Sequence, residues 1–143
     1  MIIKVINHSD NKLPSISTSG SAGMDLKASL HEPIVLKSME RCLIPTGLYI
    51  EIPQGYEGQI RSRSGLSIDY GIIVLNAPGT IDSDYRGEIK IVLMNLSKDN
   101  FYIKNGDRIA QLVINSYITP EWKLVDTLNE SQRNTGGFGS TGL

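Results

Sequence analysis

Cysteine, histidine and long apolar runs are all scarce in this chain. Cys42 is the only cysteine, so it cannot form an internal disulfide, and no CxxC pair is present for zinc or redox chemistry. Two histidines, His8 and His31, are too few for a histidine-rich metal site. The longest apolar stretches, such as Ile72 to Leu75, are too short to span a membrane, and the first residues do not resemble a signal peptide. These absences predict a soluble, cytoplasmic protein with no membrane partner.

An excess of positive charge is also missing. Lysine and arginine together number 14 and aspartate and glutamate 15, which gives a formal net charge of −1. A protein that holds nucleic acid by its phosphate backbone needs a basic face, so we expect no nucleic-acid partner. This balance still permits a small pocket for one nucleotide. The length of 143 residues and the 40% hydrophobic content predict one folded domain.

Short β-type runs bounded by Gly, Pro, Asn and Asp recur along the chain. They predict strands at residues 2–6, 48–52, 57–63, 72–75, 101–103, 108–114 and 122–125. The run at 72–75 is wholly apolar, which is typical of a strand covered on both faces. Ile89, Ile91 and Leu93 occupy alternate positions and are expected on one face of a further strand. Asn105-Gly106 is a strong hairpin signal between two of the runs.

One segment alone has a helical pattern, at residues 66–70, with Ser64 near its start and Gly71 placed to end it. Many strands and one short helix favour a sandwich or jelly roll over a βαβ fold. After Leu128 the sequence becomes polar and rich in glycine. We therefore predict a β domain over residues 1–128 and a flexible tail over 129–143.

Five polar segments stand out from this β background, and each has an ordinary interpretation beside a functional one. Asp25 in residues 21–26 is typical of a turn. The two arginines and two hydroxyls of 61–66 suit either an anion site or a solvated strand end. Segment 79–87 offers a carboxylate to activate water and a ring to stack, or a turn and a packing residue. Segment 108–112 alone reads as a strand with exposed polar side chains. Segment 133–142 is either a lid over a ligand or a disordered tail.

Together and in order, these segments resemble the five motifs of the trimeric deoxyuridine triphosphate nucleotidohydrolases, the dUTPases. The motifs read AGMDL, RSGLS, GTIDSDYRGE, RIAQL and RNTGGFGSTG, between residues 20 and 142. The resemblance implies an all-β, distorted jelly roll and a homotrimer whose active sites are shared between chains. It implies hydrolysis of dUTP to dUMP and pyrophosphate, which limits uracil in DNA and supplies dUMP for thymidylate synthesis. The cofactor it implies is Mg²⁺, held mainly by the substrate triphosphate.

The resemblance also assigns roles to individual residues. Asp82 would activate the water that attacks the α-phosphorus, and Tyr85 would lie against the deoxyribose and exclude a 2′-hydroxyl. Asp25 would act through water bound to Mg²⁺ or through a supporting network. The remaining substrate-binding positions are Arg63, Ser64, Gly65 and Gln111 for the phosphates; Asn76, Gly79, Thr80 and Ile81 for the uracil edge; and Arg133, Phe138, Gly139, Ser140 and Thr141 in the closing tail.

Two positions depart from the family pattern, and two other functions compete. Ser62 stands where many relatives carry proline, and Asn134 stands where glycine is frequent. These departures do not remove a proposed reacting group, but they are expected to affect closure of the tail. A dCTP deaminase shares the fold, but the hairpin around Asp82 has the hydrolase form. A non-catalytic nucleotide-binding module would not need a water-activating carboxylate. Release of ammonia from dCTP, or of pyrophosphate from dUTP, distinguishes these functions.

Overall fold

The computed structural model describes residues 1–138, which form ten strands and one short helix. Their bounds are β1 Lys4–Asn7, β2 Met24–Lys27, β3 Ile34–Leu36, β4 Arg41–Glu51, β5 Tyr56–Arg61, α1 Ser64–Tyr70, β6 Ile72–Val74, β7 Gly79–Ile81, β8 Glu88–Asn95, β9 Phe101–Ile103 and β10 Arg108–Ser116. The all-β class with one helix is therefore confirmed. Among these residues, no helix is long and apolar enough to cross a membrane.

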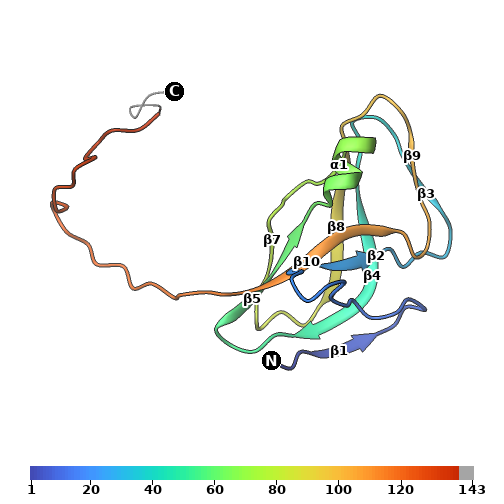
Figure 1. Cartoon of the computed structure of the whole chain (residues 1–143), viewed down its shortest axis with the longest axis horizontal. Helices are drawn as coiled ribbons and strands as arrows, with labels where there is room; N and C mark the ends of the chain where they lie inside the picture. Colours follow the sequence, from blue (N-terminus) through green and yellow to red (C-terminus); the bar gives the residue numbers. More distant parts are fainter. Residues whose placement is uncertain (139–143) are drawn as a thin grey trace.

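The strands form two four-stranded antiparallel sheets, ordered β1-β4-β8-β6 and β2-β10-β5-β7, and a separate pair, β3-β9. None of these sheets closes into a barrel. Figure 1 shows β4 and β8 behind β2 and β10. Buried side chains from both large sheets make one apolar cluster, which includes Leu26 and Leu112 from one sheet and Ile44 and Ile91 from the other. Burial of this shared layer is the main favourable term holding a sandwich of this kind together.

The alternation predicted for residues 89–93 is confirmed in β8. Ile89, Ile91 and Leu93 are each at most 1% exposed, while Lys90 between them faces solvent. Residues at every second position point to one face of a strand, so a period of two places all three in the core. The run at 72–75 behaves differently. Its strand ends at Val74, and Leu75 is 45% exposed, because β6 lies at the edge of its sheet.

The hairpin predicted at Asn105-Gly106 is wrong, although the turn itself is present. Gly106 has the positive φ of 84° that such a turn requires. The strands on either side nevertheless join different sheets, since β9 pairs with β3 and β10 pairs with β2 and β5. The turn is instead attached to the segment that follows β2: Gly106 N–H donates to the Ala28 carbonyl, and Leu30 N–H donates to Asn105 Oδ1.

Two further local predictions need correction. The helix begins at Ser64 itself, with Arg63 in the N-cap position and no side-chain cap, so Ser64 does not cap it; Gly71 ends it in the left-handed conformation, as predicted. The strand predicted at 122–125 is absent, and Trp122 is 95% exposed. A strand needs a neighbour for its backbone hydrogen bonds, and this segment lies away from both sheets (Figure 1).

The chain leaves the sheets after β10. Residues 117–138 contain no strand or helix, and they run away from the body of the molecule in Figure 1. Several large apolar side chains of this segment are almost fully exposed, namely Ile118, Trp122, Leu124, Leu128 and Phe138. Apart from this segment, the fold places β2, the end of β5 and the first half of β10 beside one another, and the predicted site residues Asp25, Arg63 and Gln111 lie on or next to these strands.

Candidate active site

Asp25 joins two arginines at one end of the β2-β10-β5 sheet. Its Oδ1 accepts a hydrogen bond from Arg63 Nε at 3.0 Å, and its Oδ2 accepts one from Arg108 Nη1 at 3.1 Å. Arg63 Nη1 also donates to the Arg108 carbonyl at 3.0 Å. Asp25 lies on β2 rather than in the turn that its neighbours suggested. The carboxylate neutralises part of the arginine charge and fixes where the remaining guanidinium N–H groups point.

This arrangement is suited to an anion. Arg63 uses two of its five N–H donors in these contacts, so the others remain available. The side chains of Arg63 and Asp25 are 23% and 30% exposed, so their charges are less screened than those of surface pairs. Arg63 and Arg108 also line a cavity of about 520 Å³. Ser64 and Gly65 follow Arg63 directly and are exposed at the start of α1.

Gln111 belongs to the same cluster because of the register of β10. It pairs with Asp25 on one neighbouring strand and with Arg61 on the other. Its Nε2 donates to the Ser62 carbonyl at 2.9 Å, which ties β10 to the segment after β5. Gly23 lies against the Gln111 amide so closely that an added Cβ would overlap its side-chain oxygen. A residue without a side chain at position 23 is therefore required for this placement of Gln111.

Sequence reasoning missed one member of this cluster, Arg108. It begins β10, and its guanidinium binds Asp25 Oδ2, the carboxylate oxygen that Arg63 does not contact. The position lies in a segment that the sequence analysis singled out, but a strand-start arginine there has no local partner. Only the pairing of β10 with β2, two segments more than 80 residues apart in sequence, brings the two charges together.

The second group of predicted residues lies on and after β7. Asn76 is exposed between β6 and β7, and Gly79, Thr80 and Ile81 form β7 itself, at the edge of the sheet next to β5. The Ala77–Pro78 peptide bond between these strands is cis. The hairpin expected here is not formed, because β6 pairs with β8 and β7 pairs with β5; residues 76–85 are called the β7 loop below. Asp82 follows β7 and is exposed. Its carboxylate has no hydrogen-bond or ion-pair partner within residues 1–138, and it lines a cavity of about 700 Å³. An unpartnered carboxylate in an open cavity is free to accept a proton from water.

Tyr85 closes the turn that begins at Asp82. Its N–H donates to the Asp82 carbonyl at 3.2 Å, and its hydroxyl donates to the Glu88 carbonyl at 3.1 Å. The ring is 44% exposed, so one part of it packs on the turn and the rest is open to a ligand. This is the half-buried position that either a packing residue or a stacking residue would occupy.

The arginine cluster and Asp82 lie beyond opposite ends of β5. Ile81 pairs with Gly58 near the beginning of β5, so Asp82 follows at that end, whereas Arg63 comes after the last residue of β5, Arg61. The three residue steps from Gly58 to Arg61 span about 10 Å at 3.4 Å per residue. The cavities beside Arg63 and Asp82 are lined by different residues. Within one chain, the backbone at Asp82 and the backbone at Arg63 are therefore separated by at least the length of this segment.

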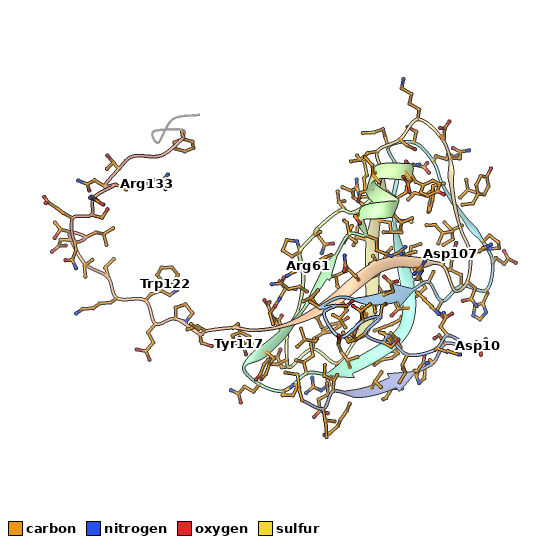
Figure 2. The ribbon with its side chains drawn as sticks, viewed as in Figure 1. Asp10, Arg61, Asp107, Tyr117, Trp122 and Arg133 are labelled. Carbon is orange, nitrogen blue, oxygen red and sulfur yellow. The ribbon has the colours of Figure 1, made fainter. Side chains whose placement is uncertain are left out.

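The described part of the tail, residues 129–138, does not contact either group. Arg133 Nε donates to the Gly136 carbonyl at 2.7 Å, Phe138 is exposed, and both lie on the extended segment that leads away from the sheets (Figure 2). The predicted residues Gly139, Ser140 and Thr141 lie outside the described part of the chain.

The two departures from the family pattern have local explanations. Ser62 Oγ accepts a hydrogen bond from Val74 N–H at 2.8 Å, which joins the segment after β5 to β6. Proline at this position has no hydroxyl to offer. Asn134 has a φ of 46°, and asparagine is enriched among the few non-glycine residues that adopt this left-handed conformation. Asparagine is therefore a workable substitute for glycine there.

A metal held by protein side chains alone does not fit this site. Among residues 1–138, no group of three or more His, Cys, Asp or Glu side chains could hold an ion. Both oxygens of Asp25 accept from arginines, and each keeps a lone pair that can accept from water. The donor set is consistent with a cation carried by an anionic ligand and contacted by Asp25 through water.

Comparison with known proteins gives concordant matches. A family model described as dUTPase matches residues 9–142. The deoxyuridine 5′-triphosphate nucleotidohydrolase of Finegoldia magna is 57% identical over 142 residues, 99% of each chain. That of Treponema denticola is 56% identical over 131 residues, 92% of this chain and 91% of its own.

Solved structures agree with the sequence relatives. The dUTPase of Staphylococcus bacteriophage 80alpha with dUpNHpp has a TM-score of 0.85 at 30% identity, with 99% of both chains covered. A variant of the dUTPase from phage phi11 of S. aureus, described as coordinating a structural Mg(II) ion, has a TM-score of 0.82 at 27% identity. It covers 91% of this chain and 100% of its own.

Proposed function

The chain belongs to the dUTPase family and is a dUTP diphosphatase, and from this premise we propose that water activated by Asp82 attacks the α-phosphorus of dUTP. The attack forms a bond from the water oxygen to the α-phosphorus and breaks the bond to the bridging oxygen. The products are dUMP and pyrophosphate. The matches confirm the family resemblance of the five motifs. The roles of individual residues are our proposal.

The arginine cluster would bind the triphosphate. Arg63 and Gln111 would contact phosphate oxygens, with Ser64 and Gly65 beside the bridging oxygen. The support is geometric, since Asp25 holds both arginines while leaving guanidinium donors free. Displacement at phosphorus needs positioning and charge neutralisation more than covalent chemistry, and oriented cationic donors supply both. Mg²⁺, when bound to the triphosphate, would add charge neutralisation, and Asp25 would contact it through water.

The β7 loop, residues 76–85, would supply the base and the selectivity for uracil. Asp82 would take a proton from the attacking water, a role consistent with its unpartnered, exposed carboxylate. Backbone groups of Gly79, Thr80 and Ile81, with the Asn76 side chain beside them, would pair with the uracil edge. Cytosine exchanges a donor for an acceptor at this edge and would leave those groups unpaired, a mismatch that can discriminate by about 10⁴-fold or more.

A homotrimer with shared sites would reconcile the separation along β5 with the chemistry. A base and the phosphate it serves must lie within reach of one water, about 3 Å from each, yet Asp82 and Arg63 are beyond opposite ends of a strand segment about 10 Å long. A ring of three chains can place the β7 loop of one chain, with Asp82, against the arginine cluster of the next. The tail, through Arg133 and Phe138 and the residues after them, would close over the site and exclude water.

Three consequences of the family premise belong to the same proposal. We infer that the chain works in the cytoplasm, limits the incorporation of uracil into DNA and supplies dUMP for thymidylate synthesis. The domain division proposed from the sequence, a β domain over 1–128 and a closing tail over 129–143, is kept on the ground that residues 117–138 make no strand or helix.

The observation that carries the mechanism is the exposed Asp82 carboxylate on the turn after β7, which has no hydrogen-bond or ion-pair partner within residues 1–138. The test is hydrolysis of dUTP with Mg²⁺ in water enriched in ¹⁸O. Attack at the α-phosphorus places the label in dUMP and leaves pyrophosphate unlabelled. Label in pyrophosphate would overturn the assigned point of attack. Ammonia released from dCTP would indicate a deaminase, and binding of dUTP without turnover would indicate a non-catalytic module.

A further inference from the structure

We propose that Gly87 is a positioning residue for Tyr85, and that its lack of a side chain sets the preference for deoxyribose over ribose. The inference rests on the proposed function, in which the Tyr85 ring lies against the sugar. It concerns a residue to which neither the sequence motifs nor the relatives assign a role here.

The evidence is a close approach between the Tyr85 ring and the Gly87 backbone. A Cβ added at Gly87 would lie 2.5 Å from Tyr85 Cζ and 2.9 Å from Cε2, and nearer still to the hydroxyl oxygen. Real Cβ atoms essentially never come within 3.0 Å of another heavy atom. The ring and any side chain at position 87 therefore cannot both occupy their present positions.

The backbone of the turn is held by its own hydrogen bonds, so the ring is the part that would yield. Arg86 Nη1 donates to the carbonyls of Ser83 at 2.7 Å and Tyr85 at 2.9 Å. After the turn, Glu88 Oε1 accepts from Gly47 N–H at 2.9 Å, which fixes the start of β8. These contacts enclose position 87 from both sides.

Backbone conformation does not require glycine at this position. Gly87 has no φ in the left-handed region, unlike Gly47, Gly55, Gly71 and Gly106. Alanine is thus compatible with the main chain at position 87, and the three atoms nearest to its methyl group would all belong to Tyr85. The substitution Gly87→Ala consequently moves one aromatic side chain and little else, which makes the inference testable.

The expected result is a loss of sugar selectivity. A site that rejects one added hydroxyl by shape discriminates by on the order of 10²-fold. Moving the ring away from the sugar removes that barrier. We therefore expect the ratio of kcat/KM for dUTP to kcat/KM for UTP to fall by about tenfold or more in Gly87→Ala, toward the value for Tyr85→Ala.

The experiment compares five proteins: the wild type, Gly87→Ala, Tyr85→Ala, the double variant and Gly20→Ala. Gly20 is the matched control, because an added Cβ meets nothing within 4 Å and the backbone is not left-handed. In the double variant the ring is absent, so Gly87→Ala should cause no further change in selectivity or in thermal unfolding. Gly20→Ala should keep the wild-type selectivity.

A readout independent of activity follows the ring itself. In protein labelled with 3-fluorotyrosine, the Tyr85 ¹⁹F resonance, assigned with Tyr85→Phe, should shift in Gly87→Ala and stay in place in Gly20→Ala. If Gly87→Ala does not fold, the double variant should fold and match Tyr85→Ala. Unchanged selectivity in folded Gly87→Ala, an unmoved resonance, or an equal effect of Gly87→Ala in the absence of the ring would overturn the inference. Failure of the wild type to hydrolyse dUTP would instead overturn the proposed function.

Discussion

Two inactive variants of this chain should restore activity when they are assembled together. Asp82→Asn removes the proposed base, and Arg63→Gln removes the guanidinium that binds phosphate. The two positions lie beyond opposite ends of a segment of β5 that spans about 10 Å, which is more than the roughly 6 Å that one water can bridge when it lies about 3 Å from each group. Under the proposed shared site, a working site draws Asp82 from one chain and Arg63 from another.

The size of the recovery follows from random assembly. In an equal mixture, the chain that contributes the β7 loop to a site carries an intact Asp82 in half of the cases. Its neighbour carries an intact Arg63, independently, in half of the cases. About one quarter of the sites should then be complete, so the mixture should recover about 25% of wild-type turnover. If both groups served a site within their own chain, no mixed trimer would contain a complete site.

The assay is dUTP turnover after the two variants are unfolded together and refolded. Distinct affinity tags and native mass spectrometry would verify that mixed trimers have formed. Each variant refolded alone gives the baseline, and mixing after separate refolding controls for contamination. Turnover no higher than either parent, with mixed trimers present, would refute the shared site.

Four other outcomes are expected. Asp82→Asn should bind dUTP with nearly unchanged affinity by calorimetry but lose about 10² to 10⁴-fold in kcat, and an unchanged kcat would exclude Asp82 as the base. Removing the chain from Arg133 onward should leave thermal unfolding unchanged and greatly lower kcat/KM, because those described tail residues pack on neither sheet. Asn95→Ala should lower the free energy of unfolding in urea by about 3 kcal/mol, because Asn95 is fully buried and its Nδ2 donates to the Leu36 carbonyl at 2.9 Å. Burial raises the pKa of the Cys42 thiol above its ordinary 9.0, so at pH 8 iodoacetamide should modify it more slowly than it modifies a free peptide thiol, and the rate should rise as the pH rises past 9.

Local patterns in the sequence predicted those elements that are specified by a few neighbouring residues, such as an alternation of buried and exposed positions or a single glycine at a helix end. The alternation of Ile89, Ile91 and Leu93 was sufficient for β8, and Gly71 was sufficient for the end of α1. Strand partners were not predictable in this way. Asn105-Gly106 specifies a turn over two residues, but whether the flanking strands pair depends on β3 and β2, which lie far away in the sequence.

The candidate site divides along the same line. Five ordered motifs indicated the family and most of the residues proposed to bind substrate. The contacts between motifs needed the fold, because Arg108 meets Asp25 and Gln111 meets Ser62 only through the register of β10. The conflict between Gly87 and Tyr85 is also invisible in sequence, since it depends on the direction in which one ring turns back.

The separation of Asp82 from Arg63 along β5 has a genetic consequence if neighbouring chains complete each site. A chain defective at both positions inactivates the site to which it supplies Asp82. It also inactivates the neighbouring site to which it supplies Arg63. One such chain then disables two of the three sites in a trimer. A cell that carries one normal and one doubly defective copy of the gene would retain about a quarter of its sites rather than half. Because the separation along β5 requires two chains to complete each proposed site, such an allele would behave as partly dominant.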